Sequence, residues 1–176
     1  MKKLLLLLLT AQFIQPAFCE DLRAIEYFRI AEGKWNSTAT SKHLPSGDSQ
    51  TRDGKWEGRF SDDFSEFIVE GEIYKDNSPQ YTLTFKFFYA SDGNIHGIYT
   101  DTQGVRSEVV ITFPDKSSYS YRSLHPDGSL KMEVNAKFSE DTIDSSFSFL
   151  TPEGQVYIKG SGRDTRQAQQ GAAANP

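Results

Sequence analysis

The stretch Leu130–Phe138, LKMEVNAKF, decides the fold class of this chain. Its apolar residues stand at every second position and alternate with polar ones such as Lys131 and Glu133. Successive side chains of a strand point to opposite faces, so the pattern predicts a strand with one buried and one solvated face. The stretch Tyr81–Tyr89, YTLTFKFFY, repeats the alternation with larger side chains. The sequence therefore predicts antiparallel sheet rather than helix.

Turn signals divide the chain between Trp35 and Arg163 at short, regular intervals. Glycine supplies the positive φ that tight turns need, and proline presets the first corner. The turn segments are Ser46–Asp48, Asp76–Pro79, Ser91–Asn94, Asp101–Gly104, Pro114–Lys116, Pro126–Gly128 and Thr151–Gly154. Strands joined by short turns lie antiparallel and adjacent. We therefore predict an all-β fold, an up-and-down meander of about 8–10 strands that closes into a barrel and so removes its free edges.

One short helix is predicted before the strands, over Asp21–Glu32. Asp21 can cap its first turn, and Gly33 can end it. Three apolar residues recur at helical spacing and need a surface to cover: Leu22, Ile25 and Phe28. Phe88 and Ile98 are out of phase with their strands. We expect these two to form a small outer patch under the helix, with a dimer contact as the alternative.

The two ends of the chain differ from the middle. Lys2–Lys3, the apolar run from Leu4, and small residues at Ala17 and Cys19 are typical of a secretory signal peptide cleaved before Glu20. After Arg163 the apolar period stops, which predicts a disordered tail. The predicted organisation is residues 1–19 as signal peptide, 20–163 as one barrel domain, and 164–176 as tail. We expect a secreted or periplasmic protein.

Composition narrows the partners. Cys19 is the single cysteine, so the mature chain has no disulfide and no thiolate metal site. A lipid anchor on Cys19 is the alternative, although Phe18 is bulky for that motif. The formal charge of −5 disfavours nucleic acid. We expect a monomer without a membrane span after cleavage. Asn36 begins a glycosylation sequon that applies only in a eukaryotic secretory pathway.

The alternation also predicts an aromatic inner face. A barrel of about eight strands is either filled by its own side chains or just wide enough for one small ligand. Aromatic walls with a few tyrosine hydroxyls suit a small hydrophobic or aromatic molecule. The candidate ligand-binding residues of the lumen are Trp56, Phe85, Phe87, Tyr89, Tyr99, Tyr119 and Tyr121. A self-filled aromatic core explains the same pattern, and the two alternatives remain open at this point.

The motif Gly33-Lys34-Trp35, between a short helix and the meander, resembles the start of the barrel in the lipocalin and calycin superfamily. The chain is also similar to small secreted bacterial proteins of unknown function that have lipocalin-like barrels. The segments that carry this second resemblance are Trp56–Phe60, Tyr89–Gly93 and Gly97–Asp101. The resemblance covers residues 22–163. It implies a barrel whose floor contains Gly33 and Trp35, and a hydrophobic ligand; it implies no catalytic residue.

No catalytic or metal-binding constellation is apparent. The three histidines lie at strand ends, in turns or out of phase with the inner face: His43, His96 and His125. We therefore expect no haem, no zinc and no other cofactor. Gly160-Ser161-Gly162 lacks the following helix of a nucleophile elbow. An enzyme on this scaffold would need a carboxylate or histidine beside the aromatic residues, and the alternation predicts neither. We expect a non-enzymatic protein.

The leading hypothesis from sequence is a secreted binding protein for a small hydrophobic or aromatic ligand in the barrel lumen. The alternative is a filled barrel that acts through its surface, as an envelope interaction or structural module. Space above Trp35 would favour the first hypothesis, and a packed lumen would favour the second.

Overall fold

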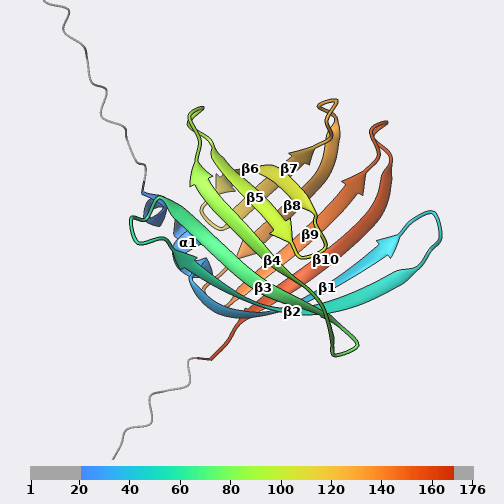
Figure 1. Ribbon diagram of the computed structural model, residues 1–176, viewed down its shortest axis with the longest axis horizontal. Helices are drawn as coiled ribbons and strands as arrows, with labels where there is room; N and C mark the ends of the chain where they lie inside the picture. The colour runs from blue at the N-terminus through green and yellow to red at the C-terminus, as the bar shows by residue number, and fades with distance from the viewer. Residues whose placement is uncertain (1–20, 169–176) are drawn as a thin grey trace, which may run out of the picture.

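The computed structural model describes residues 21–168. Ten antiparallel strands form one closed barrel, and each strand pairs with its neighbours in the chain (Figure 1). The strands are β1 Gly33–His43, β2 Ser49–Phe60, β3 Glu66–Lys75, β4 Ser78–Tyr89, β5 Ile95–Asp101, β6 Arg106–Asp115, β7 Ser118–Leu124, β8 Leu130–Phe138, β9 Thr142–Leu150 and β10 Val156–Arg166. The predicted all-β meander is confirmed. The predicted signal peptide, its cleavage site and residues 169–176 lie outside the described residues.

Pairing of β1 with β10 closes the barrel. The register places Trp35 opposite Arg166 and Ser37 opposite Asp164. On its other side, β1 pairs with β2, where Trp35 faces Trp56. Strand β10 thus continues three residues beyond Arg163, the last barrel residue expected from the sequence. Closure requires this length, because an antiparallel partner must accompany β1 down to Trp35.

The N-terminal segment closes one end of the barrel. It forms a 3₁₀ turn, η1 Leu22–Ala24, and a short helix, α1 Glu26–Ala31, separated by the extended residue Ile25. The Asp21 carboxylate accepts a hydrogen bond from the Arg23 backbone N–H, as expected for its cap. Gly33 has a φ of +103°, which turns the chain sharply from the helix into β1. The single helix expected over residues 21–32 is therefore two short pieces.

The helix enters the barrel instead of covering its outer face. Leu22 and Phe28 are completely buried and cluster with the inner residues Phe67 and Phe87. The expected outer patch under the helix is therefore wrong. Phe88 remains half-buried on the outer face, where its ring lies 6.3 Å from the ring of His96. The helix points inward because its apolar residues find a larger apolar surface inside the barrel end.

Gly58 shows how closely the helix approaches the wall. A Cβ atom at this position would lie 2.3 Å from the backbone oxygen of Ala31 and 2.7 Å from Cζ of Phe67. No residue larger than glycine fits there without moving the helix. The end of the barrel that contains α1 is called the closed end below.

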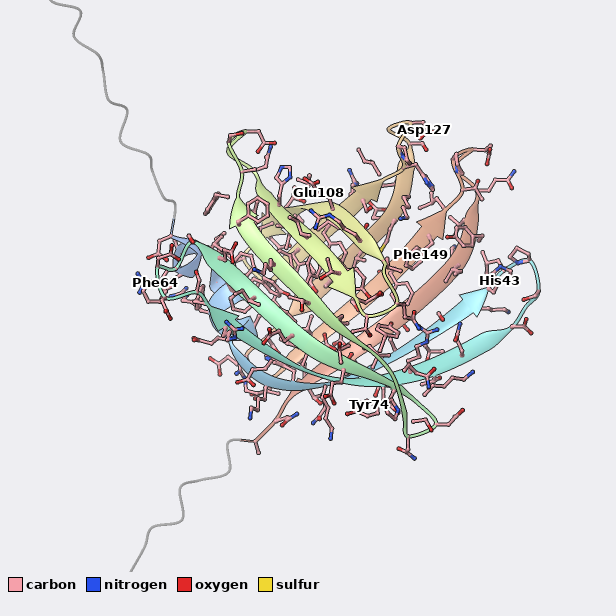
Figure 2. All side chains as sticks on the ribbon, viewed as in Figure 1. His43, Phe64, Tyr74, Glu108, Asp127 and Phe149 are labelled. Carbon is pink, nitrogen blue, oxygen red and sulfur yellow. The ribbon has the colours of Figure 1, made fainter. Side chains whose placement is uncertain are left out.

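The opposite end, called the open end, carries the turns at residues 44–48, 76–77, 102–105, 125–129 and 151–155. Figure 1 shows these turns spread apart. In Figure 2, His43 and Asp127 mark two of the open-end turns, and Phe64 lies beside the helix at the closed end. Most large apolar inner residues toward the open end are half-buried, whereas the helix residues Leu22 and Phe28 and their neighbours Phe67 and Phe87 are buried. The half-buried inner residues are Leu83, Phe85, Tyr99, Met132, Phe147, Phe149 and Ile158.

Candidate functional site

Trp35 forms the floor of the barrel. It is fully buried in the cluster that contains the helix residues Phe28 and Ala31. Its ring stacks on Trp56, with the ring centroids 5.2 Å apart and the planes 7° from parallel. The guanidinium carbon of Arg166 lies 4.6 Å from the Trp35 ring centroid. This arrangement combines aromatic stacking with a cation–π contact.

Arg166 ties the floor to the closed end. Its Nη1 and Nε atoms each donate a 2.9 Å hydrogen bond, to the backbone oxygens of Glu32 and Glu140 respectively. Its Nη2 donates to the backbone oxygen of Ile30. One side chain thereby joins the helix, the turn between β8 and β9, and the ring of Trp35. Among residues 21–168, the indole Nε1 of Trp35 is the one buried side-chain nitrogen or oxygen atom without a hydrogen-bond partner.

An aromatic wall rises above the floor from neighbouring strands. The ring of Phe85 lies 6.1 Å from that of Tyr99 and 5.8 Å from that of Tyr121, each at an edge-on angle of 89°. Gly97 makes room for Phe85, since a Cβ atom there would lie 2.5 Å from Cε2 of the phenylalanine ring. The wall is therefore built from large rings on β4, β5 and β7, and Gly97 on β5 leaves room for the ring of Phe85.

The residues expected in the lumen separate into two groups by depth. Phe87 and Tyr119 are only 3% and 7% exposed and belong to the closed-end cluster. Tyr89 ends β4 at the closed end, beside Ile95, and is half-buried. The other four are half-buried residues of the inner face: Trp56, Phe85, Tyr99 and Tyr121. These four keep part of their surface accessible to solvent.

Asp164 is the polar residue that sequence reasoning missed. It lies on the inner face of β10, between Ser37 of β1 and the buried Ile143 of β9. Burial raises the pKa of the Asp164 carboxyl above its usual value, although hydrogen bonding to the side chains of Ser37 and Trp56 acts in the opposite direction. The expectation of no carboxylate beside the inner aromatic residues is therefore wrong.

Three tyrosine hydroxyls face the same region as Asp164. Burial raises the pKa of Tyr27, Tyr119 and Tyr121, the last to about 12, and the nearby Asp164 carboxylate raises each of them further. Their phenol groups are therefore neutral donors at physiological pH. Tyr27 comes from α1 and packs 4.4 Å, centroid to centroid, from Tyr119 on β7. We call Asp164, Ser37, Trp56 and these three tyrosines the carboxyl cluster.

Polar groups nearer the open end already have partners. Tyr99 donates a 2.8 Å hydrogen bond to Asp101, whose other carboxylate oxygen accepts from the backbone N–H groups of Gln103 and Val105. Arg52 lies over the ring of Tyr81, 5.9 Å from its centroid.

The histidines lie away from the carboxyl cluster. His96 is on the outer face between Asp92 and Glu108, at 3.1 and 3.2 Å. His125 contacts the backbone oxygen of Leu150 through Nε2, and His43 contacts Ser46 in the turn after β1. Within residues 21–168, no three histidine, cysteine or carboxylate side chains come together as a metal site.

Comparisons with known proteins bear on the fold. No family model and no curated protein matches the chain. The crystal structure of Rv2717c from M. tuberculosis is similar, with a TM-score of 0.65 and 12% identity over 84% of this chain and 98% of that one. A de novo designed fluorescence-activating β-barrel has a TM-score of 0.42 and 13% identity over 81% of this chain and 99% of its own.

The redesigned barrel mFAP0, solved with DFHBI bound, has a TM-score of 0.40 and 16% identity over 78% of this chain and 99% of that one. The likeness to Rv2717c shows the fold: a closed antiparallel barrel. Among the described residues, no helix is long and apolar enough to cross a membrane.

Proposed function

We propose that this chain is a secreted, non-enzymatic protein that binds a small hydrophobic or aromatic molecule in the open half of its barrel. The observation that carries the proposal is the partial exposure of large apolar side chains on the inner face, such as Phe85, Phe149 and Ile158. The wall is a continuous hydrogen-bonded sheet, and the helix closes one end. Solvent therefore reaches these side chains from the open end, and a ligand can follow the same route.

Binding would work by burial of apolar surface. Each CH₂ group that leaves water contributes roughly 0.8 kcal/mol, and rings placed edge-on against Phe85 or Tyr99 add aromatic contacts. The floor formed by Trp35 and Trp56 sets the depth that a ligand can reach. Asp164 has hydroxyl groups and an indole N–H as neighbours, rather than the second acid–base group that hydrolysis of a glycoside requires. These features favour binding over catalysis.

The test compares two aromatic residues of the same strand. Phe85 faces the lumen, whereas Phe88 is half-buried on the outer face. The mature chain, Phe85→Ala and Phe88→Ala are each purified from cells and examined by native mass spectrometry. We expect a small molecule bound to the mature chain and to Phe88→Ala, and at least about tenfold less on Phe85→Ala, which corresponds to about 1.4 kcal/mol.

A small molecule retained equally by all three proteins would contradict a lumen site. The lumen site would also be contradicted by two results together: masses that show no bound molecule, and tryptophan fluorescence that neither fatty acids nor aromatic probes quench. That second result would favour the filled barrel, acting through its surface as an envelope interaction or structural module.

A further inference from the structure

The carboxyl cluster has one carboxyl group, that of Asp164, and no basic side chain lies opposite it in the register of β1 and β9. The register places Asp164 opposite Ser37 on β1 and Ile143 on β9, one inner position along from the stacked pair Trp35 and Trp56. The side chains that hydrogen-bond to it, Ser37 and Trp56, are neutral donors. Neutral donors compensate a half-buried carboxylate incompletely, because taking an ion even partly out of water is costly. A cation would complete the site.

The basic residues nearest in the fold are engaged elsewhere. Arg163 faces outward and holds Asp144 through hydrogen bonds of 2.6 and 2.9 Å. Arg166 shares the inner face with Asp164, but its guanidinium donates to backbone oxygens at the closed end and lies over Trp35. Arg52 lies against Tyr81. Among residues 21–168, none of these side chains forms an ion pair with Asp164.

From this juxtaposition we infer that the lumen binds small aromatic or hydrophobic molecules that carry a protonated amine, with Asp164 as the counter-ion. The inference rests on the proposed function and specifies its ligand class. The apolar part of such a molecule would lie against Phe85, Tyr99 and Phe149 in the open half. The ammonium group would donate hydrogen bonds to the Asp164 carboxylate, beside the rings of Trp56 and Tyr121, where cation–π attraction adds to the charge pairing.

The affinity should depend on pH in a defined direction. Five side chains from four elements face Asp164: Tyr27 on α1, Ser37 on β1, Trp56 on β2, and Tyr119 and Tyr121 on β7. The charge of Asp144 on the adjacent strand β9 is paired with Arg163 on the outer face. The other groups that face Asp164 are hydroxyls and an indole N–H, which do not titrate between acid and neutral pH. A second inner carboxylate, Asp101, ends β5 at the open end, where Tyr99 and two backbone N–H groups donate to it. Amine affinity should therefore rise with pH as Asp164 ionises, from a pKa that burial places above its usual value.

Three probes that share an indolylethyl group test the inference by calorimetry at neutral pH. Tryptamine carries an ammonium group, tryptophol a hydroxyl, and indolepropionate a carboxylate. We expect tryptamine to bind at least about tenfold more tightly than tryptophol, and indolepropionate to bind weakest. Asp164→Asn should reduce the affinity for tryptamine by about tenfold or more and leave tryptophol within about twofold. Asp144→Asn, which removes a carboxylate from the outer face of the adjacent strand, should change neither.

The outcomes separate this inference from the function on which it rests. Equal binding of all three probes, or unchanged tryptamine affinity in Asp164→Asn, overturns the amine assignment and leaves a lumen that binds apolar molecules. Failure of every probe to bind the mature chain overturns both. Circular dichroism and the thermal midpoint of Asp164→Asn verify that it is folded, since removing a buried charge should not unfold the barrel.

Discussion

The closed and open ends of this barrel are built from the same alternating strands, yet they differ in density. At the closed end, the ring of Phe28 lies between 5.1 and 6.0 Å from the rings of Phe67, Phe87 and Phe113. At the open end, the inner rings of Phe147 and Phe149 are half-buried and contact each other at 6.1 Å. The helix supplies the side chains that fill one end, and no described segment does so at the other. Alternation thus determines which face is inside, while the helix determines how much of the inside is filled.

The largest expected effect comes from shortening one ring at each end. Phe28→Ala should lower the free energy of unfolding by about 3–5 kcal/mol, because Phe28 is completely buried. Phe149→Ala should lower it by roughly 1–2 kcal/mol, since part of its ring already contacts solvent. Urea unfolding of the two variants measures both losses, and they can be compared directly if the m-values of the variants agree. Equal losses would mean that the open half is packed like a core, and would break the comparison.

An intermediate effect is expected at the contact between floor and helix. Arg166→Lys keeps the charge but loses the planar fork that serves three backbone oxygens, so we expect a loss of about 1–3 kcal/mol. Arg163→Lys is the matched control on the outer face. Its partner Asp144 is exposed, and we expect a change of less than about 1 kcal/mol. If the two replacements destabilise the protein equally in urea, Arg166 does not anchor the closed end.

The smallest expected effect sharpens the contrast at Asp164. Burial raises the pKa of Asp164 in the folded protein above the unfolded value of 3.8. The folded protein therefore loses stability as pH rises from the unfolded pKa through the folded pKa. Asp164→Asn removes this loss and should raise the thermal midpoint at neutral pH, with the gain vanishing below the unfolded pKa. Asp144→Asn should do the reverse, because its hydrogen bonds to Arg163 lower the Asp144 pKa and stabilise the fold above that unfolded pKa. Thermal melts across pH would contradict this account if both variants shifted in the same direction.

Much of the fold could be predicted because the strands of a closed sheet alternate between inward and outward side chains. Alternation in stretches such as Tyr81–Tyr89 identified inner residues, and the register pairs them around the barrel, for example Val69 with Phe85 and Phe85 with Tyr99. Turn residues located the strand ends. Depth along the barrel axis was not predictable in the same way, since Phe85 and Phe87 share one face but differ in exposure.

The end of the last strand was missed for a related reason. The inner positions of β10 near its end are Gly162, Asp164 and Arg166, so the apolar period disappears although the strand continues. Hydrophobic pattern alone therefore reads this segment as a tail. A geometric signal was available: a strand that closes the barrel must be as long as its partner β1, which begins at Gly33.

The order of strands around the barrel has a consequence for how the molecule folds. Every pairing except β1 with β10 joins neighbours in the chain, whereas that last pairing brings together residues such as Asn36 and Gln167, 131 positions apart. Closing so long a loop costs conformational entropy, so we expect β1 and β10 to pair last. Until they pair, the sheet has two unprotected edges. Ser37 and Asp164 face each other across that seam. The carboxyl cluster is therefore assembled by the closing step itself, and a partly folded chain cannot present it.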